Sequence, residues 1–280
     1  MNALELRGLQ KTYGDFTLDI GELTLPEGCV MGLVGENGAG KSTTIRLILD
    51  STRADGGSVT VLGRSSQEDP RRTKAEIGAV LDELGIPGLT ALELGHVLEN
   101  IYPNWEAETY GRLLQKLSVP ADKPFHKLSQ GMKKKLGIAA AFSHNARLLL
   151  LDEATNGLDP VARDDVNEML RDFAAEGRNA VLISSHIVSD LEKICDYIAF
   201  LHKGRLLLCE EKDVLEASYG LLHCPAARLE ELDGSAILTR RITAFGAEAV
   251  VRRDGVPRGT ELSPVGIEEI FIAMAKEDRS

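Results

Sequence analysis

The sequence predicts an α/β fold in which a mostly parallel core sheet is covered by helices on both faces, with an antiparallel β subdomain ahead of it. Strands that are buried on both faces are almost continuously apolar, and such runs occur at residues 30–34, 148–151, 180–184 and 197–201. Helical segments such as 161–175 separate the later runs, as the crossover helices of a parallel sheet do. A glycine-rich stretch at 35–40 joins the first run to another amphipathic segment.

The antiparallel subdomain is predicted from residues 3–25. Apolar and polar side chains alternate there on both sides of a turn at 13–15, which indicates a hairpin. Tyr13 stands at this turn, just ahead of the glycine-rich stretch. Its ring is either an ordinary hairpin aromatic or a platform on which an adenine base stacks, and chemistry alone does not separate these two roles.

The glycine-rich stretch has the features of a phosphate-binding loop. Its glycines allow the backbone to turn N–H groups inward around an anion, and the helix that begins near Lys41 adds the positive end of its dipole. Lys41 is expected to reach the β- and γ-phosphates, and the Ser42 hydroxyl to ligate Mg²⁺. A turn that binds nothing is the alternative, but the required offsets of Gly35, Gly40, Lys41 and Ser42 favour a nucleoside triphosphate. The residues predicted to hold it are Asn37, Gly38, Ala39, Gly40, Lys41, Ser42 and Thr43.

The middle of the chain is predicted to carry a helical insertion. Short strands are expected at 56–63 and 76–81, after which strand signals fade and apolar stripes at helical spacing indicate a helical subdomain at about 83–143. The α/β core closes near residue 209.

Beyond the core, the periodicity weakens from about residue 216. Strand-like pieces at 236–243 and 248–253 precede a helix from 264 to about 276, so we expect a small α+β appendage. The chain is therefore divided into a nucleotide-binding unit, 1–215, and an appendage, 216–280.

Two carboxylates and a histidine follow buried strands at the edge where ligands gather in open α/β sheets. Asp152 and Glu153 end the apolar run at 148–151, and His186 follows the run at 180–184. Asp152 is expected to hold Mg²⁺, and Glu153 to accept a proton from the water that attacks the γ-phosphate. His186 is expected to donate to that phosphate. Solvated side chains at strand ends are the alternative for all three.

A second candidate anion site lies at residues 128–132. Ser129 is predicted as the N-cap of an alanine-rich helix with Gly131 in its first turn, which exposes N–H groups to an anion. A capped helix followed by a solvated lysine run is the plain alternative. A second anion site makes sense only if it serves a neighbouring molecule.

Composition limits the functional classes. A formal net charge of −11 argues against a nucleic-acid partner, because phosphate backbones are held by basic patches. The cysteines at 29, 195, 209 and 224 form no CxxC pair, so reduced cytosolic thiols are expected rather than disulfides or zinc. We find no signal segment and no apolar run approaching the ~20 residues that span a bilayer. Membrane association is expected only through a partner.

Taken together, these residues resemble the ATP-binding cassette of ABC transporters over about 4–211. The motifs are Walker A at 35–43, the signature at 128–132, Walker B at 148–152, the D-loop at 157–159 and the switch histidine, His186. The resemblance implies a P-loop NTPase fold and ATP hydrolysis with Mg²⁺, with Glu153 and His186 as catalytic residues. It also implies two cassettes head to tail, in which the signature residues Ser129, Gln130 and Gly131 of one close on the nucleotide of the other. Tyr13 matches the adenine-stacking aromatic of the family, which favours that role.

Three positions depart from the common family pattern. Asp82 stands where most members have the Q-loop glutamine, and its carboxylate is still able to ligate Mg²⁺ alongside Ser42 and Asp152. Ala154 replaces the proline that usually follows the catalytic glutamate, and Met132 replaces the signature glutamine.

The acidic Q-loop, the signature at 128–132 and the stretch at 102–105 look most like bacterial cassettes of the ABC-2 exporter type, which includes antimicrobial-peptide and phenol-soluble-modulin exporters. This implies a transmembrane permease partner, a second cassette in a homodimer or heterodimer, and export of a peptide, drug or lipid-like amphiphile. The protein is then expected to be cytoplasmic and peripheral on the inner face of the membrane. A soluble ABC-type ATPase that is not coupled to transport is the alternative.

Overall fold

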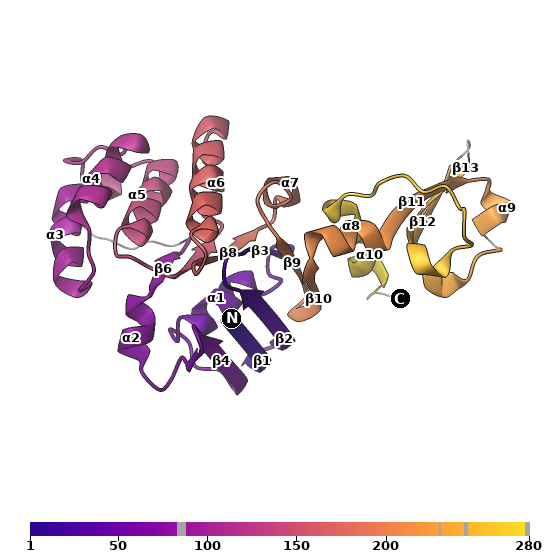
Figure 1. Ribbon diagram of the computed structural model, residues 1–280, viewed down its shortest axis with the longest axis horizontal. Coiled ribbons are helices and arrows are strands. Elements are labelled where there is room, and N and C mark those ends of the chain that lie inside the picture. The colour runs from indigo at the N-terminus through magenta and orange to yellow at the C-terminus, as the bar shows by residue number, and fades with distance from the viewer. Residues whose placement is uncertain (83–87, 230, 244–245, 278–280) are drawn as a thin grey trace.

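The computed structural model describes residues 1–82, 88–229, 231–243 and 246–277. The start of the predicted helical subdomain at residue 83 lies outside these residues, as do the last three positions of the predicted appendage. In the described part, one ten-stranded mixed sheet forms the centre of the molecule, helices α3 to α5 gather at one end, and a three-stranded sheet lies at the other (Figure 1).

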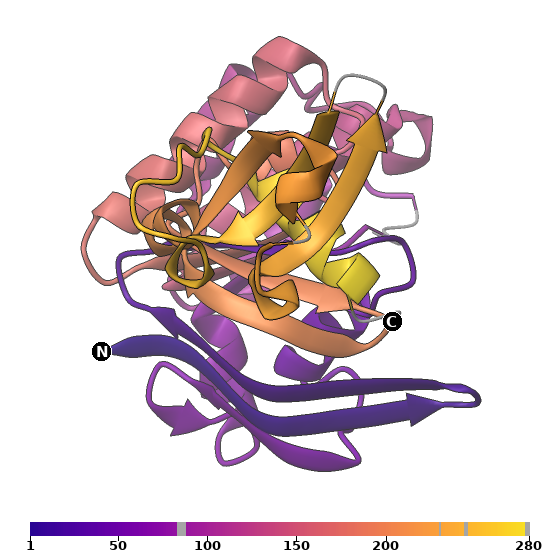
Figure 2. The same ribbon diagram turned by 90° about the vertical axis from the view of Figure 1, so that its right-hand side faces the viewer.

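The large sheet contains the predicted parallel core. In chain order its strands are β1 Asn2–Tyr13, β2 Phe16–Pro26, β3 Val30–Val34, β4 Gly56–Val61, β5 Arg64–Ser65, β6 Ile77–Val80, β7 Leu148–Asp152, β8 Ala180–Ser185, β9 Tyr197–His202 and β10 Arg205–Glu211. Their order across the sheet is β5-β4-β1-β2-β10-β9-β3-β8-β7-β6. The pairs β9·β3, β3·β8, β8·β7 and β7·β6 are parallel, so the carboxyl ends of five neighbouring strands meet at one edge. The predicted hairpin is confirmed as the long antiparallel pair β1·β2, seen along its length in Figure 2.

The helices that accompany this sheet are α1 Lys41–Ile48, α2 Pro70–Ala75, α3 Ala91–Ile101, α4 Ala107–Lys116, η1 Phe125–Lys127, α5 Gln130–Phe142, α6 Pro160–Ala175 and α7 Val188–Leu191. Helix α7 is a single turn. Side-chain caps define where several helices begin: Thr90 and Glu93 form a capping box on α3, and Asp159 caps α6 with Pro160 in its first turn.

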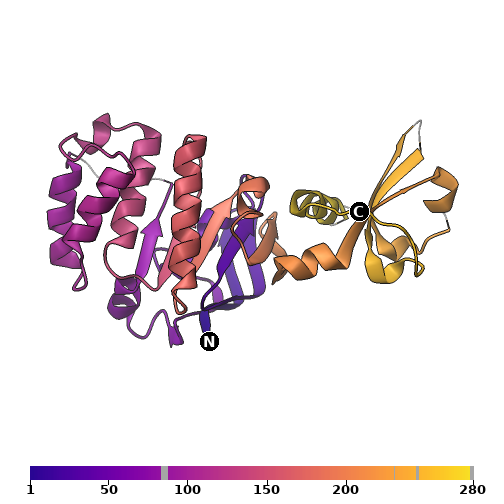
Figure 3. The same ribbon diagram turned by 45° about the horizontal axis from the view of Figure 1, so that its top comes forward.

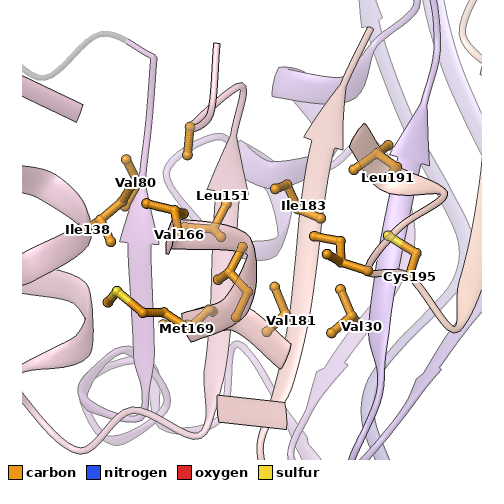
Figure 4. Close-up of a cluster of buried hydrophobic side chains, with 14 of the residues drawn as sticks. Val30, Val80, Ile138, Leu151, Val166, Met169, Val181, Ile183, Leu191 and Cys195 are labelled. Atoms are coloured by element: carbon orange, nitrogen blue, oxygen red, sulfur yellow. The ribbon is translucent and has the colours of Figure 1, made fainter. Parts of the chain in front are cut away.

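The apolar strands bury alternate residues on opposite faces of the sheet. On one face, Val30, Leu151 and Ile183 pack against Val166 and Met169 of α6 (Figure 4). The intervening residues join the core on the α1 side, and these are Met31, Leu33, Leu148, Leu150 and Leu182. Because a strand has a period of two, burial of both sets requires the continuous apolar runs from which the parallel sheet was predicted.

The C-terminal part forms a separate small sheet. Its elements are α8 Lys212–Ser218, β11 Tyr219–Cys224, α9 Ala226–Leu229, η2 Gly234–Ala236, β12 Ile237–Thr243, β13 Gly246–Arg252, η3 Arg253–Gly255 and α10 Ile267–Glu277. The antiparallel order is β11-β13-β12, and β11 and α8 were not predicted from the sequence. Figure 3 shows α10 lying between this sheet and the large one. There, Phe271 contacts Phe200 of β9 with ring centroids 5.3 Å apart, so the helix joins the two parts.

Candidate functional site

A cavity of about 470 Å³ lies where the parallel strands end. The segments that follow β3, β6, β7 and β8 all contribute to it, as expected for a ligand site at the carboxyl edge of an open α/β sheet. The residues that line it are Phe16, Glu36, Asn37, Gly38, Ala39, Gly40, Lys41, Ser42, Thr43, Asp82, Glu153, Asn156 and His186. Residues predicted from four separate parts of the sequence therefore share one cavity.

The glycines of the phosphate loop are required by its backbone. Gly40 has a φ of 111°, and a Cβ there would lie 2.7 Å from Cδ1 of Leu18. Gly35 approaches the carbonyl oxygen of Leu201 so closely that a Cβ would lie 2.5 Å from it. A side chain at either position would force the loop away from the sheet, because Cβ atoms do not approach other atoms so closely.

Lys41 begins α1 and turns its ammonium back over the loop. Its Nζ donates to the carbonyl oxygens of Gly35 at 2.7 Å and Glu36 at 3.3 Å, and it lies 3.3 Å from Oε1 of Glu153. Only 5% of the residue is exposed, so these three oxygens compensate a buried positive charge. The ammonium is thus held beside both the loop and the candidate base.

The Asp152 carboxylate and the backbone of Glu153 are held by Ser184 of the neighbouring strand. The Ser184 hydroxyl donates to Oδ1 of Asp152 at 2.7 Å, and it accepts the N–H of Glu153 at 3.1 Å. The same N–H also points at the Ser184 carbonyl oxygen at 3.2 Å. Glu153 has a φ of 51°, a left-handed conformation that is uncommon for a residue with a side chain and that persists only where its surroundings enforce it. Ser184 was not predicted as a site residue.

The Glu153 carboxylate lies between two nitrogen donors. Oε2 is 2.9 Å from Nδ1 of His186, which comes from the loop after β8, while Oε1 faces Lys41. This arrangement places a carboxylate, an imidazole and an ammonium around one point of the cavity. Such a set is able to orient a water molecule and to stabilise charge that develops on a transferred phosphoryl group.

Lys134 occupies a position that the sequence did not indicate. It belongs to the lysine run for which solvation was the plain alternative, yet only 7% of it is exposed. Its Nζ donates to the carbonyl oxygen of Glu153 at 2.6 Å and lies 3.0 Å from Oδ1 of Asp82. The α5 helix is thereby tied to two residues of the cavity wall.

The predicted magnesium ligands supply oxygen donors, which Mg²⁺ prefers. Ser42 and Asp82 line the cavity, and Asp152 is buried next to Glu153. The Ser184 hydroxyl donates to Oδ1 of Asp152, and Lys134 pairs with Oδ1 of Asp82, so each contact uses one of the two oxygens of its carboxylate. Among the described residues there is no cluster of three or more His, Cys, Asp and Glu side chains that could hold a metal, so the Ser42 hydroxyl is part of the candidate set.

The signature residues lie apart from this cavity. Ser129 caps α5 by accepting the N–H of Met132 at 3.2 Å, as predicted, but Ser129, Gln130 and Gly131 are not among the lining residues. Gly131 faces the D-loop, since a Cβ there would lie 3.2 Å from the carbonyl oxygen of Gly157. In a single chain the second candidate anion site is therefore not brought to the first.

The D-loop ends in an aspartate that caps the next helix. Asp159 accepts the N–H of Ala162 at 3.0 Å and lies 3.6 Å from Nζ of Lys135. The backbone hydrogen bond, with a smaller contribution from Lys135, lowers the pKa of Asp159 below its ordinary value. Asp159 therefore carries its charge near the start of α6, where the helix dipole favours an anion.

Tyr13 and Phe16 share the end of the hairpin but differ in position. Tyr13 is 47% exposed, has Nζ of Lys11 5.4 Å from its ring centroid, and is not among the residues that line the cavity. Phe16 does line it, next to Gly40. The role of Tyr13 in stacking adenine stays a prediction. Phe16 was missed because its alternating position in the hairpin is equally typical of a core residue.

None of the described helices combines the length and apolar character needed to cross a membrane.

Comparison with known proteins places the chain among nucleotide-binding proteins of transporters. Residues 18–156 match the family model described as ABC transporter. The lantibiotic transport ATP-binding protein SrtF of Streptococcus pyogenes is 35% identical over 239 residues, which cover 84% of this chain and 97% of that protein. The Nod factor export ATP-binding protein I of Rhizobium leguminosarum bv. viciae is 33% identical over 296 residues, which cover 97% of this chain and 94% of that protein.

A solved structure extends the likeness to three dimensions. The ATP-binding subunit of an ABC transporter superposes with a TM-score of 0.67 at 28% identity, covering 77% of this chain and 92% of that one.

Proposed function

Because this chain belongs to the ABC transporter family as an ATP-hydrolysing, ATP-binding subunit, we propose that ATP and Mg²⁺ bind in the 470 Å³ cavity and that Glu153 and His186 carry out hydrolysis there. The observation that carries this assignment is the Glu153 carboxylate, which lies 2.9 Å from His186 and 3.3 Å from Lys41 beside the phosphate loop. A carboxylate in this place is positioned to orient the attacking water and accept its proton.

The other residues have distinct roles in this proposal. The N–H groups at 37–43 surround the phosphates. When ATP binds, the Lys41 ammonium pairs with the β- and γ-phosphates in place of the Glu153 carboxylate. That exchange releases Glu153 from an ion pair and leaves it free to act as a base. Mg²⁺, held by Ser42, Asp152 and Asp82, would neutralise phosphate charge.

We propose that a second cassette completes the site. Ser129, Gln130 and Gly131 form an anion-binding helix start with no place in the cavity of their own chain. In a head-to-tail pair they would contact the γ-phosphate held by the facing chain, which is another copy of this protein or a related cassette. Contacts that exist only when ATP is present would make nucleotide binding drive closure, and hydrolysis would reverse it.

A membrane permease is the proposed partner of the helical subdomain. Helix α3 exposes Leu92, Val97 and Ile101, with Ile101 61% accessible. Val97 and Ile101 are four residues apart and so lie on one face of the helix, and exposed apolar side chains that share a face are typical of a docking surface. Binding to a permease there would hold the protein at the inner face of the membrane, in the cytoplasm.

The proposed transport direction is export. The support is the function named for two relatives, transport of a lantibiotic and export of a Nod factor. We propose that the cargo of this transporter is likewise a peptide, drug or lipid-like amphiphile.

Glu153→Gln tests the catalytic assignment. The amide keeps the size of the side chain but cannot accept the proton, so ATP turnover by the purified protein should fall by about 100-fold or more while ATP binding persists. Glu168→Gln makes the same change at an exposed position of α6 and should leave turnover intact. Vanadate-sensitive turnover in the unmodified protein is expected. Turnover by Glu153→Gln close to that of the unmodified protein would remove Glu153 from the catalytic role.

A further inference from the structure

Lys134 places a buried positive charge between two segments of the candidate site. Its Nζ is 2.6 Å from the carbonyl oxygen of Glu153 and 3.0 Å from Oδ1 of Asp82. Lys134 lies in the second turn of α5, the helix that Ser129 caps. Asp82 follows β6, and Glu153 follows β7. One ammonium group therefore joins the signature helix to the ends of two neighbouring strands.

The hydrogen bond to Glu153 acts on its backbone rather than its carboxylate. Glu153 holds the left-handed φ of 51°, which is costly for a residue with a side chain. Its N–H is held by Ser184 on one side and its carbonyl oxygen by Lys134 on the other. With both ends of the residue fixed, the side chain leaves the backbone in the direction of Lys41 and His186.

Asp82 connects this arrangement to the nucleotide cavity. It is one of the lining residues, and its side chain is 59% exposed, so it is accessible to whatever enters. The Lys134 side chain is only 9% exposed, and its ammonium needs acceptors because an unpaired buried charge is strongly unfavourable. A displacement of Asp82 therefore changes the position at which the Lys134 ammonium is most stable, and with it the constraint on Glu153.

We propose that Lys134 is a positioning residue for ATP hydrolysis, which couples the position of Asp82 to the orientation of the Glu153 carboxylate. This inference rests on the proposed role of Glu153 as the base. In this proposal the Lys134 ammonium is a charged link between Asp82, which follows β6, and the base Glu153. Movement of α5 relative to Asp82 would then switch the base between aligned and misaligned states.

Lys134→Gln is the first test. It removes the charge and should lower kcat for ATP by about 10- to 100-fold, the effect of losing a hydrogen bond from a charged donor. The dissociation constant for a fluorescent ATP analogue should change less than about twofold, because Lys41 and the loop are untouched. Lys134→Arg keeps the charge and should recover part of the loss. Lys116→Gln, at an exposed position on α4, is the matched control and should behave as the unmodified protein.

Asp82→Asn provides the second arm. Because the Asp82 side chain is largely exposed, loss of the ion pair alone should lower kcat only about two- to fivefold. In the double variant with Lys134→Gln, the Asp82 change should lower kcat less than it does alone when Mg²⁺ is saturating, since the link is already broken. A role for Asp82 only as a metal ligand would instead multiply the two effects and shift the Mg²⁺ concentration that gives half-maximal rate in both backgrounds.

The results distinguish this inference from the assignment of the base. Full turnover in Lys134→Gln, with Glu153→Gln inactive, overturns the coupling and leaves the base in place. Full turnover in Glu153→Gln overturns both. Should Lys134→Gln fail to fold, Asp82→Asn, which retains the buried lysine, is measured at saturating Mg²⁺. A kcat that stays lower there supports the coupling, and a kcat equal to that of the unmodified protein contradicts it.

Discussion

Ser184→Ala removes the hydroxyl that holds the Asp152 carboxylate and the Glu153 backbone. This group is completely buried, donates to Asp152 at 2.7 Å and accepts from the N–H of Glu153 at 3.1 Å. After the substitution, the described part of the chain offers the buried Asp152 carboxylate no hydrogen-bond donor in place of this hydroxyl. The N–H of Glu153 keeps only the Ser184 carbonyl oxygen, 3.2 Å away.

The expected magnitude follows from these contacts. A hydrogen bond to a charged, buried acceptor contributes about 1.5–3 kcal/mol, whereas the bond from the Glu153 N–H is partly replaced by the remaining carbonyl oxygen. We therefore expect the free energy of unfolding to fall by about 2 kcal/mol. Looser positioning of Glu153 should lower kcat by about 10-fold or more, since 1.4 kcal/mol in the barrier corresponds to a factor of ten.

Chemical denaturation and steady-state ATP turnover measure these two effects. Ser185→Ala is the control, because that hydroxyl accepts the N–H of Ile187 at 2.9 Å within its own loop. Ser184→Ala with an unchanged free energy of unfolding and a kcat within twofold of the unmodified protein would show that Ser184 does not hold Asp152 and Glu153 in place. An equal loss in both variants would show that the effect is general to the end of β8.

Three further predictions concern other parts of the molecule. Burial lowers the pKa of His144, so its neutral ring stabilises the fold fully above an unfolded pKa of about 6.5, and this contribution is lost as the pH falls through the folded pKa. Thermal unfolding at several pH values should show that the difference in stability between the unmodified protein and His144→Gln narrows as the pH falls. A difference that stays constant with pH contradicts this. Gly40→Ala places a Cβ 2.7 Å from Leu18 at a residue whose φ is 111°, so it should distort the loop and weaken binding of a fluorescent ATP analogue by about tenfold or more. Unchanged affinity would refute the steric argument. Phe271→Ala removes the ring that contacts Phe200, so it should lower the free energy of unfolding by about 2 kcal/mol and speed hydrogen exchange in α10. Unchanged exchange would show that α10 does not depend on this contact.

The core of the fold was predictable because its physical requirements are local in the sequence. A parallel strand covered on both faces must be apolar along its buried length, and the four leucines at 148–151 satisfy this within a few residues. The phosphate loop was equally predictable from its backbone. Its glycines are needed for positive φ or close packing whatever the rest of the chain does.

The C-terminal sheet was only partly predictable. Strand β11, Tyr219–Cys224, has no clean alternation, and its position depends on pairing with β13 from almost thirty residues later. Such a strand is defined by its neighbours, and its own sequence does not specify it. The division between 1–215 and 216–280 stays a prediction. The packing of Phe271 of α10 against β9 shows that the second part shares core contacts with the first.

The chemical groups of the site were predictable, but their supports were not. Lys41, Glu153, His186 and Asp82 meet in one cavity because strand order brings the loops together. Lys134 and the serine of β8 contact those groups only through tertiary packing. A lysine in a run of three on a helix carries no sequence signal that separates a buried link from a solvated charge.

The central claim is that the signature of one chain completes the ATP site of another. The variant pair Ser129→Asp and Ser129→Asn tests it, because both residues retain an N-cap acceptor for α5. Only the aspartate places a negative charge where the γ-phosphate held by the facing chain would lie. In the Glu153→Gln background, light scattering after gel filtration with ATP and Mg²⁺ should show a dimer. Adding Ser129→Asp should leave a monomer that still binds ATP, and adding Ser129→Asn should retain much of the dimer. A dimer that forms equally well with Ser129→Asp would contradict the composite site.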